Sequence, residues 1–499
     1  MALSGVSTCK VLLQMRRGEK PVNIVVTDPI RIDSLDLDAQ GIGRLAPNEE
    51  EALQGQSGKV VFVQGALPTE LVTYVVTREK PRFSKARVLE VIQPAVFRTE
   101  PKCKVFGVCG GCSMQHLDMR AQIAMKQRVL EDDLQHLAKV KPEEILRPMG
   151  GPAWEYRHRA RLSVVNRSIK KGTVLIGFHE GKSGYVADMT ACEILPRRVS
   201  ELLPELRKLV MAFSIVDFVP QIELAVGEAE EPNAINSAKA KPVIALVFRH
   251  LKPLNRADEQ LLKDFADRHQ VWIWLQPKGI ETVAPFYPQT GKLCYRLPEF
   301  EVEMPFMPAD FTQVNHLMNR ALVSKAIRLL GVQPQDRVLD LFCGIGNFTL
   351  PLARVAKDVL GIEGLASLTT RAKSNAEHNQ LADKVSFMQS NLFEVTTETI
   401  ASWGRADRWL MDPPREGAME ICQALAKLHD LSHHDVAAHL GEFLPQRIVY
   451  VSCNPKTLAR DTEILCHQAG YTLKSAGVVN MFPHTSHVES MAVFEKTAI

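Results

Sequence analysis

The feature that most constrains the fold is a run of alternating strand-like and helix-like segments beyond residue 310. Short apolar segments alternate there with segments whose apolar residues recur at helical spacing. This alternation is typical of a parallel sheet with helices on both faces. Ligands of such sheets bind at the carboxyl ends of the strands. The expected strands are 337–341, 359–362, 385–388, 408–411 and 447–451, and the expected helices are 311–330, 347–356 and 368–379.

A glycine-containing turn follows the first of these strands. Gly344 and Gly346 allow the backbone to turn sharply and to approach a ligand closely. Glu363 ends the next strand, 17 residues after Gly346, where its two oxygens can accept hydrogen bonds from both hydroxyls of a ribose. A dinucleotide fingerprint would have a third glycine at position 349, which is Thr349. The pattern favours a cofactor without phosphates, such as S-adenosylmethionine, and a plain strand-to-helix turn is the alternative.

The segment Asp412-Pro413-Pro414-Arg415 follows the strand at 408–411. Two prolines fix the backbone where the chain leaves the sheet, so we expect Asp412 to face the cleft. Methyltransferases that modify amino groups often have an aromatic residue after such a proline pair. Arg415 stands there instead, which weakens that interpretation.

Cys453 follows the apolar strand at 447–451 and is expected at the same edge of the sheet. Carbon 5 of a pyrimidine is a poor nucleophile, but addition of a thiolate to carbon 6 creates an enolate whose carbon 5 can attack a methyl sulfonium. A base must then remove the carbon 5 proton. Glu489, expected immediately before a last strand at 491–495, is a candidate base, and His487 is a rival with a more suitable intrinsic pKa. A buried, inert thiol is the alternative for Cys453.

The N-terminal half is rich in short strands. Residues 22–93 suit a small β-barrel that binds nucleic acid, with a loop at 47–58. A helix is expected at 117–137, and an exposed loop at 227–242. Further strands are expected at 159–165, 174–178, 221–226, 243–248 and 271–275.

Charge is distributed unevenly along the chain. Residues 78–171 carry a net charge of +10, whereas the remaining residues carry −7. A basic centre suits a polyanionic partner such as a nucleic acid, and a solvated charged surface is the alternative. No apolar run is long enough for a membrane span, and the N-terminus does not resemble a secretory signal, so we expect a cytoplasmic protein without membrane association.

Three of the ten cysteines, Cys103, Cys109 and Cys112, fall within ten residues. This clustering favours a metal or cluster site over a framework of disulfides.

Taken together, these motifs resemble the RNA uracil-5 methyltransferase family. The matching segments occur in order through the catalytic half: 311–315, 340–348, 412–415, 452–455 and 487–489. The resemblance implies that Cys453 is the nucleophile and Glu489 the base. It also implies pockets for S-adenosylmethionine and uracil that are lined by Gln313, Phe342, Gly344, Asn347, Glu363, Asp412 and Asn391, with Ser390 as the alternative to Asn391.

The resemblance extends to the N-terminal half. Residues 22–93 look like a TRAM domain, and Cys103, Cys109, Cys112 and Cys192 look like the family's four-cysteine site for a 4Fe-4S cluster. A zinc site is the rival, although it would normally use two close Cys-x2-Cys pairs. Both features resemble family members that act on 23S ribosomal RNA rather than transfer RNA. Residues 423–446 look longer than the family's usual stretch, and Pro414 replaces an alanine often found in these members.

We therefore predict a multidomain α/β protein that methylates carbon 5 of a uridine in 23S ribosomal RNA and acts as a monomer. Another RNA target, a non-catalytic RNA-binding assembly factor and an amino-group methyltransferase are the alternatives. The predicted parts are an N-terminal extension at 1–21, a TRAM-like β-barrel with an OB-like form at 22–93, a central β-rich domain with the iron–sulfur site at 94–305, and a Rossmann-like class I methyltransferase domain at 306–499.

Overall fold

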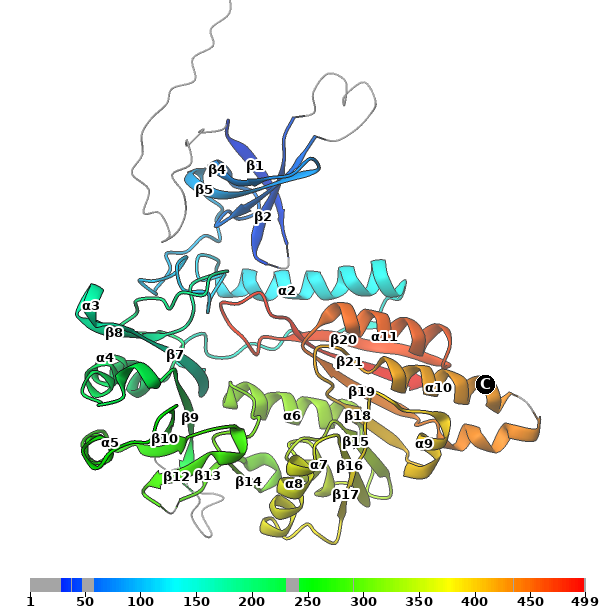
Figure 1. Ribbon diagram of the computed structural model, residues 1–499. Coiled ribbons are helices and arrows are strands. Elements are labelled where there is room, and N and C mark those ends of the chain that lie inside the picture. Colours follow the sequence, from blue (N-terminus) through cyan, green and yellow to red (C-terminus); the bar gives the residue numbers. More distant parts are fainter. Residues whose placement is uncertain are drawn as a thin grey trace, which may run out of the picture. The chain divides into compact units, whose positions relative to one another are not determined.

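The computed structural model describes residues 28–36, 38–46, 58–229, 242–289, 291–433 and 435–497 (Figure 1). The predicted extension at 1–21 and most of the predicted loops at 47–58 and 227–242 lie outside these residues. The chain divides into two compact units. Unit 1 consists of residues 1–122, 179–187 and 484–486, and unit 2 consists of residues 123–178, 188–483 and 487–499. The predicted domain boundaries at 93/94 and 305/306 stay predictions.

Unit 1 contains a closed five-stranded barrel, which confirms the barrel expected from the sequence. Its strands run around the barrel in the order β1-β2-β3-β5-β4, and a core of alternating apolar residues such as Val61 and Val63 fills it. Glu70 is fully buried and accepts hydrogen bonds from the backbone of Leu67 at 2.8 Å and from the Arg98 guanidinium at 2.8 Å. The barrel strands are β1 (Ile30–Leu35), β2 (Gln40–Arg44), β3 (Val60–Gln64), β4 (Leu71–Glu79) and β5 (Phe83–Gln93).

Unit 2 contains two eight-stranded sheets. The first has the order β12-β11-β10-β9-β13-β14, with β7 paired to both β8 and β9. Its strands are β7 (Arg159–Arg167), β8 (Thr173–Gly177), β9 (Gln221–Ala229), β10 (Pro242–Arg249), β11 (Trp272–Gln276), β12 (Ala284–Tyr287), β13 (Leu293–Leu297) and β14 (Val302–Phe306). Its helices are α3 (Ser168–Lys171), α4 (Arg197–Met211) and α5 (Arg256–His269).

The second sheet has the order β17-β16-β15-β18-β19-β21-β20-β6. Strands β15 to β19 are parallel, as the sequence predicts, and β21 runs antiparallel to both β19 and β20. The strands are β6 (Glu144–Ile145), β15 (Arg337–Leu341), β16 (Asp358–Glu363), β17 (Val385–Gln389), β18 (Arg408–Met411), β19 (Arg447–Ser452), β20 (Tyr471–Val479) and β21 (Glu489–Lys496).

Helices cover both faces of the second sheet (Figure 1). Leu425 and Leu465, from α10 and α11, belong to the apolar core on one face, whereas Leu322 and Leu350, from α6 and α7, belong to the core on the other. The helices are α2 (Met119–Asp133), α6 (His316–Leu330), α7 (Thr349–Ala353), α8 (Ala366–His378), α9 (Thr397–Trp403), α10 (Met419–Ser432) and α11 (Pro455–His467). Within the described part of the chain, no helix has the length and apolar character needed to cross a membrane.

Several elements differ from the sequence-based expectations. The helix expected from residue 311 begins at His316, because Asn315 is extended and its side chain caps the helix by accepting a hydrogen bond from the backbone of Met318 at 3.2 Å. The helix expected at 347–356 is only Thr349–Ala353, because the residues before it form the glycine turn. Glu489 does not precede the last strand but begins it, since Glu489 pairs with Val479 of β20.

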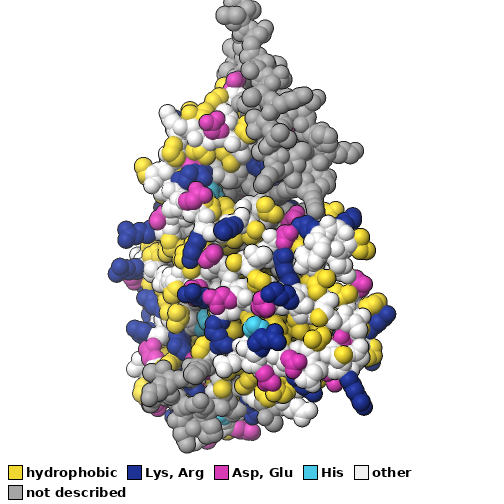
Figure 2. All heavy atoms as spheres, turned by 90° about the vertical axis from the view of Figure 1, so that its left-hand side faces the viewer, with side chains coloured by type: hydrophobic (Ala, Val, Ile, Leu, Met, Phe, Trp, Pro, Cys, Tyr) yellow, Lys and Arg dark blue, Asp and Glu magenta, His cyan; other side chains and the backbone are white. Residues whose placement is uncertain are grey.

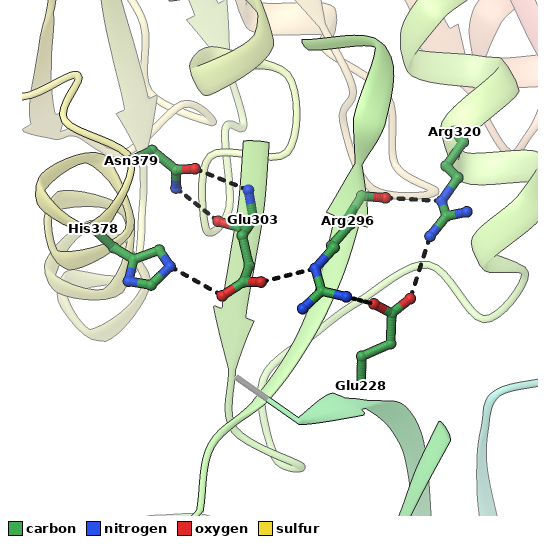
Figure 3. Close-up of polar contacts among 6 residues, drawn as sticks. All are labelled: Glu228, Arg296, Glu303, Arg320, His378 and Asn379. Carbon is green, nitrogen blue, oxygen red and sulfur yellow. Dashed lines mark hydrogen bonds and ion pairs between the residues drawn. The ribbon is translucent and has the colours of Figure 1, made fainter. Parts of the chain in front are cut away.

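An ionic network with a buried central pair, Arg296 and Glu303, joins the first sheet of unit 2 to helices α6 and α8 (Figure 3). Arg296 on β13 donates to Glu303 on β14 at 2.8 Å and also pairs with Glu228 on β9. Arg320 on α6 donates to the carbonyl of Arg296 at 2.8 Å, and His378 on α8 lies 3.1 Å from the second carboxylate oxygen of Glu303. The network therefore fixes the position of α6, the helix whose Asn319 contacts the glycine turn.

Candidate active site

The order of the second sheet identifies where a ligand binds. Strands β16 and β17 lie on one side of β15, whereas β18 and β19 lie on the other. The order in which successive strands are added to the sheet therefore reverses between β15 and β18. Ligands of open α/β sheets bind at the carboxyl ends of strands beside such a switch point. The glycine turn, Glu363, Asp412 and Cys453 follow or end the strands at this edge, as the sequence predicts.

The turn after β15 has an unusual backbone. Phe342, Gly344 and Gly346 have φ angles of 64°, 56° and 95°, in the left-handed region that favours glycine. The backbone N–H of Gly344 donates to one carboxylate oxygen of Glu363 at 3.1 Å, and the N–H of Leu365 donates to the other at 3.1 Å. A Cβ atom added to Gly344 would meet no described atom within 4 Å, so the backbone is open to a ligand there.

Asp340, near the end of β15, is a further candidate site residue that has no role in the sequence-based predictions. It is fully buried, and its Oδ2 atom accepts a hydrogen bond from the Thr349 hydroxyl at 2.5 Å. Its Oδ1 atom is buried and has no hydrogen-bond partner among the described residues. Burial raises the pKa of Asp340 to about 7. The signal that could have revealed it is an acidic residue inside an otherwise apolar strand.

The other residues predicted to line the cofactor and uracil pockets differ in their exposure and in their contacts. The side-chain oxygen of Asn347 accepts hydrogen bonds from Asn319 and from the hydroxyl of Tyr295, each at 2.9 Å. Asn391 is exposed, and its side-chain oxygen accepts a hydrogen bond from the backbone of Phe393 at 3.1 Å. The rings of Phe393 and Phe342 lie 5.8 Å apart. Gln313 is half-buried and lies in the segment without regular secondary structure before α6.

Cys453 directly follows β19, and Glu489 begins the neighbouring strand β21. Ser452, at the end of β19, pairs with Ser490 of β21. Cys453 directly follows Ser452, and Glu489 directly precedes Ser490. Burial raises the pKa of the half-buried Cys453 thiol to about 11, and the nearby charges of Glu489 and Asp412 act in the same direction. Burial and the charge of Asp412 also raise the pKa of Glu489 well above its usual value. These three groups therefore form one electrostatically coupled cluster, in which burial favours the neutral forms of the Cys453 thiol and the Glu489 carboxyl group.

His487, the rival base, lies two residues before Glu489. Its ring packs against Phe482, with ring centroids 5.6 Å apart. Burial lowers the pKa of His487, and the charges of Arg415, Lys126 and Arg157 lower it further. His487 is therefore neutral at physiological pH, and both candidate bases remain.

Lys126 of α2 anchors the segment that precedes His487 and Glu489. It is buried and donates to the Asn480 side chain at 2.8 Å and to the Phe482 carbonyl at 2.9 Å. Burial lowers the pKa of Lys126 to about 7. This residue was absent from the sequence-based predictions, because a lysine on an amphipathic helix is normally solvated.

The four predicted cluster cysteines are divided between the two units. Cys103, Cys109 and Cys112 belong to unit 1, whereas Cys192 belongs to unit 2. Burial raises the pKa of Cys109, and the nearby Cys103 raises it further. Among the residues that the structure describes, no group of three or more His, Cys, Asp or Glu side chains is arranged to hold a metal ion.

Comparisons with known proteins identify relatives of this chain. A family model described as tRNA (Uracil-5-)-methyltransferase matches residues 298–497. The 23S rRNA (uracil(1939)-C(5))-methyltransferase RlmD of Polynucleobacter necessarius is 76% identical over 97% of this chain and 100% of its own length. The RlmD protein of Cupriavidus pinatubonensis is 59% identical over 94% of this chain and 96% of its own length.

A solved structure shares the fold. The Pyrococcus abyssi tRNA (uracil-54, C5)-methyltransferase in complex with S-adenosyl-L-homocysteine has a TM-score of 0.64 and 21% identity, and the match covers 93% of this chain and 99% of that chain. The high identity of the two RlmD relatives over nearly their whole length establishes the family: this protein belongs to the RNA uracil-5 methyltransferases.

Proposed function

We propose that this protein transfers a methyl group from S-adenosylmethionine to carbon 5 of a uridine in 23S ribosomal RNA. The observation that carries the proposal is the coupled cluster of Cys453, Glu489 and Asp412 at the sheet edge that also carries the glycine turn. Relatives at 76% and 59% identity that are named for uracil 1939 of 23S rRNA support the same target nucleotide here.

Cys453 is the proposed nucleophile. Its thiolate adds to carbon 6 of the uracil, and carbon 5 of the resulting enolate then accepts the methyl group. Glu489, as a carboxylate, removes the proton from carbon 5, and the C6–S bond breaks to release the thiolate. Because the pKa of Cys453 is raised to about 11 and that of Glu489 is also raised, both groups must ionise before this sequence runs. The target base must leave its stack to reach Cys453.

The residues at the glycine turn fit S-adenosylmethionine. The carboxylate of Glu363 keeps acceptor capacity for ribose hydroxyls while it holds the backbone of Gly344. The unpartnered Oδ1 atom of Asp340 suits an ammonium donor such as the amino group of the methionine moiety. Phe342, Asn391 and Gln313 complete the proposed pocket. Because its side-chain oxygen is engaged by Asn319, we assign Asn347 to holding the turn rather than to a direct contact.

We also propose a 4Fe-4S cluster held by Cys103, Cys109, Cys112 and Cys192. The spacing of the first three thiols and the influence of Cys103 on the pKa of Cys109 support it. Four cysteine thiolates are the donor set that such clusters prefer, and Cys453 supplies the methylation chemistry without it. Anaerobic purification followed by iron and sulfide assays tests this proposal. Stoichiometric zinc without sulfide would contradict it.

The barrel and the basic part of unit 2 are the proposed RNA-binding surfaces. Figure 2 shows the face of unit 2 that carries α3 and α4, where Lys and Arg side chains are spread among Asp and Glu. Arg161 and Lys170 are among the exposed cations of this region. Cations that contact phosphates make RNA binding weaken as salt concentration rises.

Two variants test the mechanism. Cys453→Ala should abolish formation of 5-methyluridine, and mass-spectrometric mapping of 23S ribosomal RNA from cells with and without the protein would locate the target. Glu489→Gln should let the covalent RNA adduct form but hinder its release, so that the adduct accumulates on denaturing gels. Methylation by the Cys453→Ala protein would refute the mechanism, and the absence of an adduct with Glu489→Gln would favour His487 as the base.

A further inference from the structure

Arg415 is a cation of the active site that the mechanism above does not use. Arg415 is exposed and follows the Asp412-Pro413-Pro414 segment after β18. Among the charges that act on the Cys453 thiol, those of Glu489 from β21 and Asp412 from the loop after β18 oppose ionisation, whereas that of Arg415 favours it. The charge of Arg415 also acts on His487, which lies two residues before Glu489.

Helix α11 holds the backbone around Arg415. The carbonyl oxygen of Arg415 accepts hydrogen bonds from the Asn454 side chain at 3.0 Å and from the Thr457 hydroxyl at 3.2 Å. Asn454 directly follows Cys453, so the arginine loop and the cysteine turn are bonded to each other.

Two more contacts fix the next residues of the loop. Arg460 donates to the carbonyl oxygen of Glu416 at 2.8 Å, and the N–H of Ala418 donates to Asp461 at 2.7 Å. Asp461 is fully buried and also accepts a hydrogen bond from the Tyr450 hydroxyl at 2.6 Å. The loop that carries Arg415 is thus anchored on the helix that begins immediately after the nucleophile.

We propose that the Arg415 guanidinium stabilises the thiolate of Cys453, and that α11 holds the arginine in place for this purpose. This inference rests on the proposed function, because it takes Cys453 as the nucleophile. A thiol that must ionise beside two carboxylates needs a compensating positive charge, and a guanidinium keeps its charge at every pH of interest. Arg415 therefore acts through Cys453, and it does so before RNA is bound.

The test is the pH dependence of Cys453 alkylation in the full-length protein without RNA. Iodoacetamide is the probe, and mass spectrometry follows the Cys453 peptide so that the other cysteines do not interfere. At a fixed pH below the pKa of the thiol, Arg415→Gln should slow alkylation about 3- to 10-fold, as expected for the loss of one nearby charge. Arg415→Lys should restore part of the rate.

Lys456→Gln is the matched control. Lys456 is exposed, lies three residues from Cys453, and acts on Asp133, but it is not among the charges that shift the Cys453 pKa. This variant should alkylate at the wild-type rate. The proposal would be overturned if the pH profile of alkylation for Arg415→Gln superimposed on the wild-type profile, even if RNA binding were weakened. It would also be overturned if Lys456→Gln shifted the profile as much as Arg415→Gln does. Failure of the proposed function would appear separately, as methylation by the Cys453→Ala protein.

Discussion

The ionic network in Figure 3 makes a quantitative prediction about stability. Arg296 and Glu303 are 3% and 2% exposed, so Arg296→Met removes the guanidinium that donates to Glu303 and leaves a carboxylate out of water. Removing one member of a buried pair costs about 3–5 kcal/mol, because the remaining charge is not solvated. We expect Arg296→Met to lower the free energy of unfolding of unit 2 by this amount.

The double variant Arg296→Met/Glu303→Met separates the two contributions to this cost. It removes both charges of the pair, while Glu228 keeps its contact with Arg320. Replacing a buried pair by apolar side chains is often neutral, so the double variant should be more stable than Arg296→Met alone by about 2 kcal/mol or more. Arg128→Met, which breaks an exposed pair with Asp132, is the control and should change stability by less than about 1 kcal/mol.

Urea unfolding followed by tryptophan fluorescence measures these differences. The signal reports on unit 2 alone, because all five tryptophans of the chain belong to it: Trp154, Trp272, Trp274, Trp403 and Trp409. A cost below about 1 kcal/mol for Arg296→Met, or a double variant as unstable as the sum of the two single variants, would show that the network does not stabilise unit 2 as argued.

Three further predictions follow from single residues. The pKa of Lys126 is about 7 in the folded protein and 10.5 normally, so the unfolded state binds more protons between these pH values, and the free energy of unfolding rises with pH there by up to about 1.4 kcal/mol per pH unit. Lys126→Met should remove this rise. Parallel curves of unfolding free energy against pH for the two proteins would contradict this. Glu363→Gln should weaken S-adenosylmethionine binding about tenfold in calorimetry, and unchanged affinity would exclude Glu363 from the pocket. Asp461→Asn should cost about 2–4 kcal/mol in urea unfolding, since the buried carboxylate accepts hydrogen bonds from Ala418 and Tyr450, and a loss below 1 kcal/mol would argue against this anchor.

Much of the catalytic fold could be predicted because each strand of the parallel sheet is a short apolar run followed by a polar or glycine residue. The strand at 408–411 matches β18 at both ends, and the glycine turn, Glu363 and Cys453 appear at the predicted edge. The early start predicted for α6 had a local cause. The helical spacing of apolar residues continues through Val314, and only the cap formed by Asn315 shows where the helix begins.

The contacts between segments distant in the chain could not be predicted. Lys126 lies more than 300 residues before Asn480, and nothing in its own helix indicates that it is buried. The unsatisfied oxygen of Asp340 likewise becomes visible only when its neighbours are placed. Local patterns report propensity and amphipathicity, whereas such buried polar partners are set by tertiary packing.

The pairing of Ser452 with Ser490 has a consequence for how this enzyme family can vary. The proposed nucleophile and the proposed base take their separation from the hydrogen-bond ladder of two adjacent strands, not from the length of the connection before β21. Changes in the length of that connection should therefore be tolerated by the chemistry as long as the ladder, Phe482 and His487 are preserved. A one-residue slip of β21, in contrast, would turn Glu489 to the opposite face of the sheet and leave the thiol without its base.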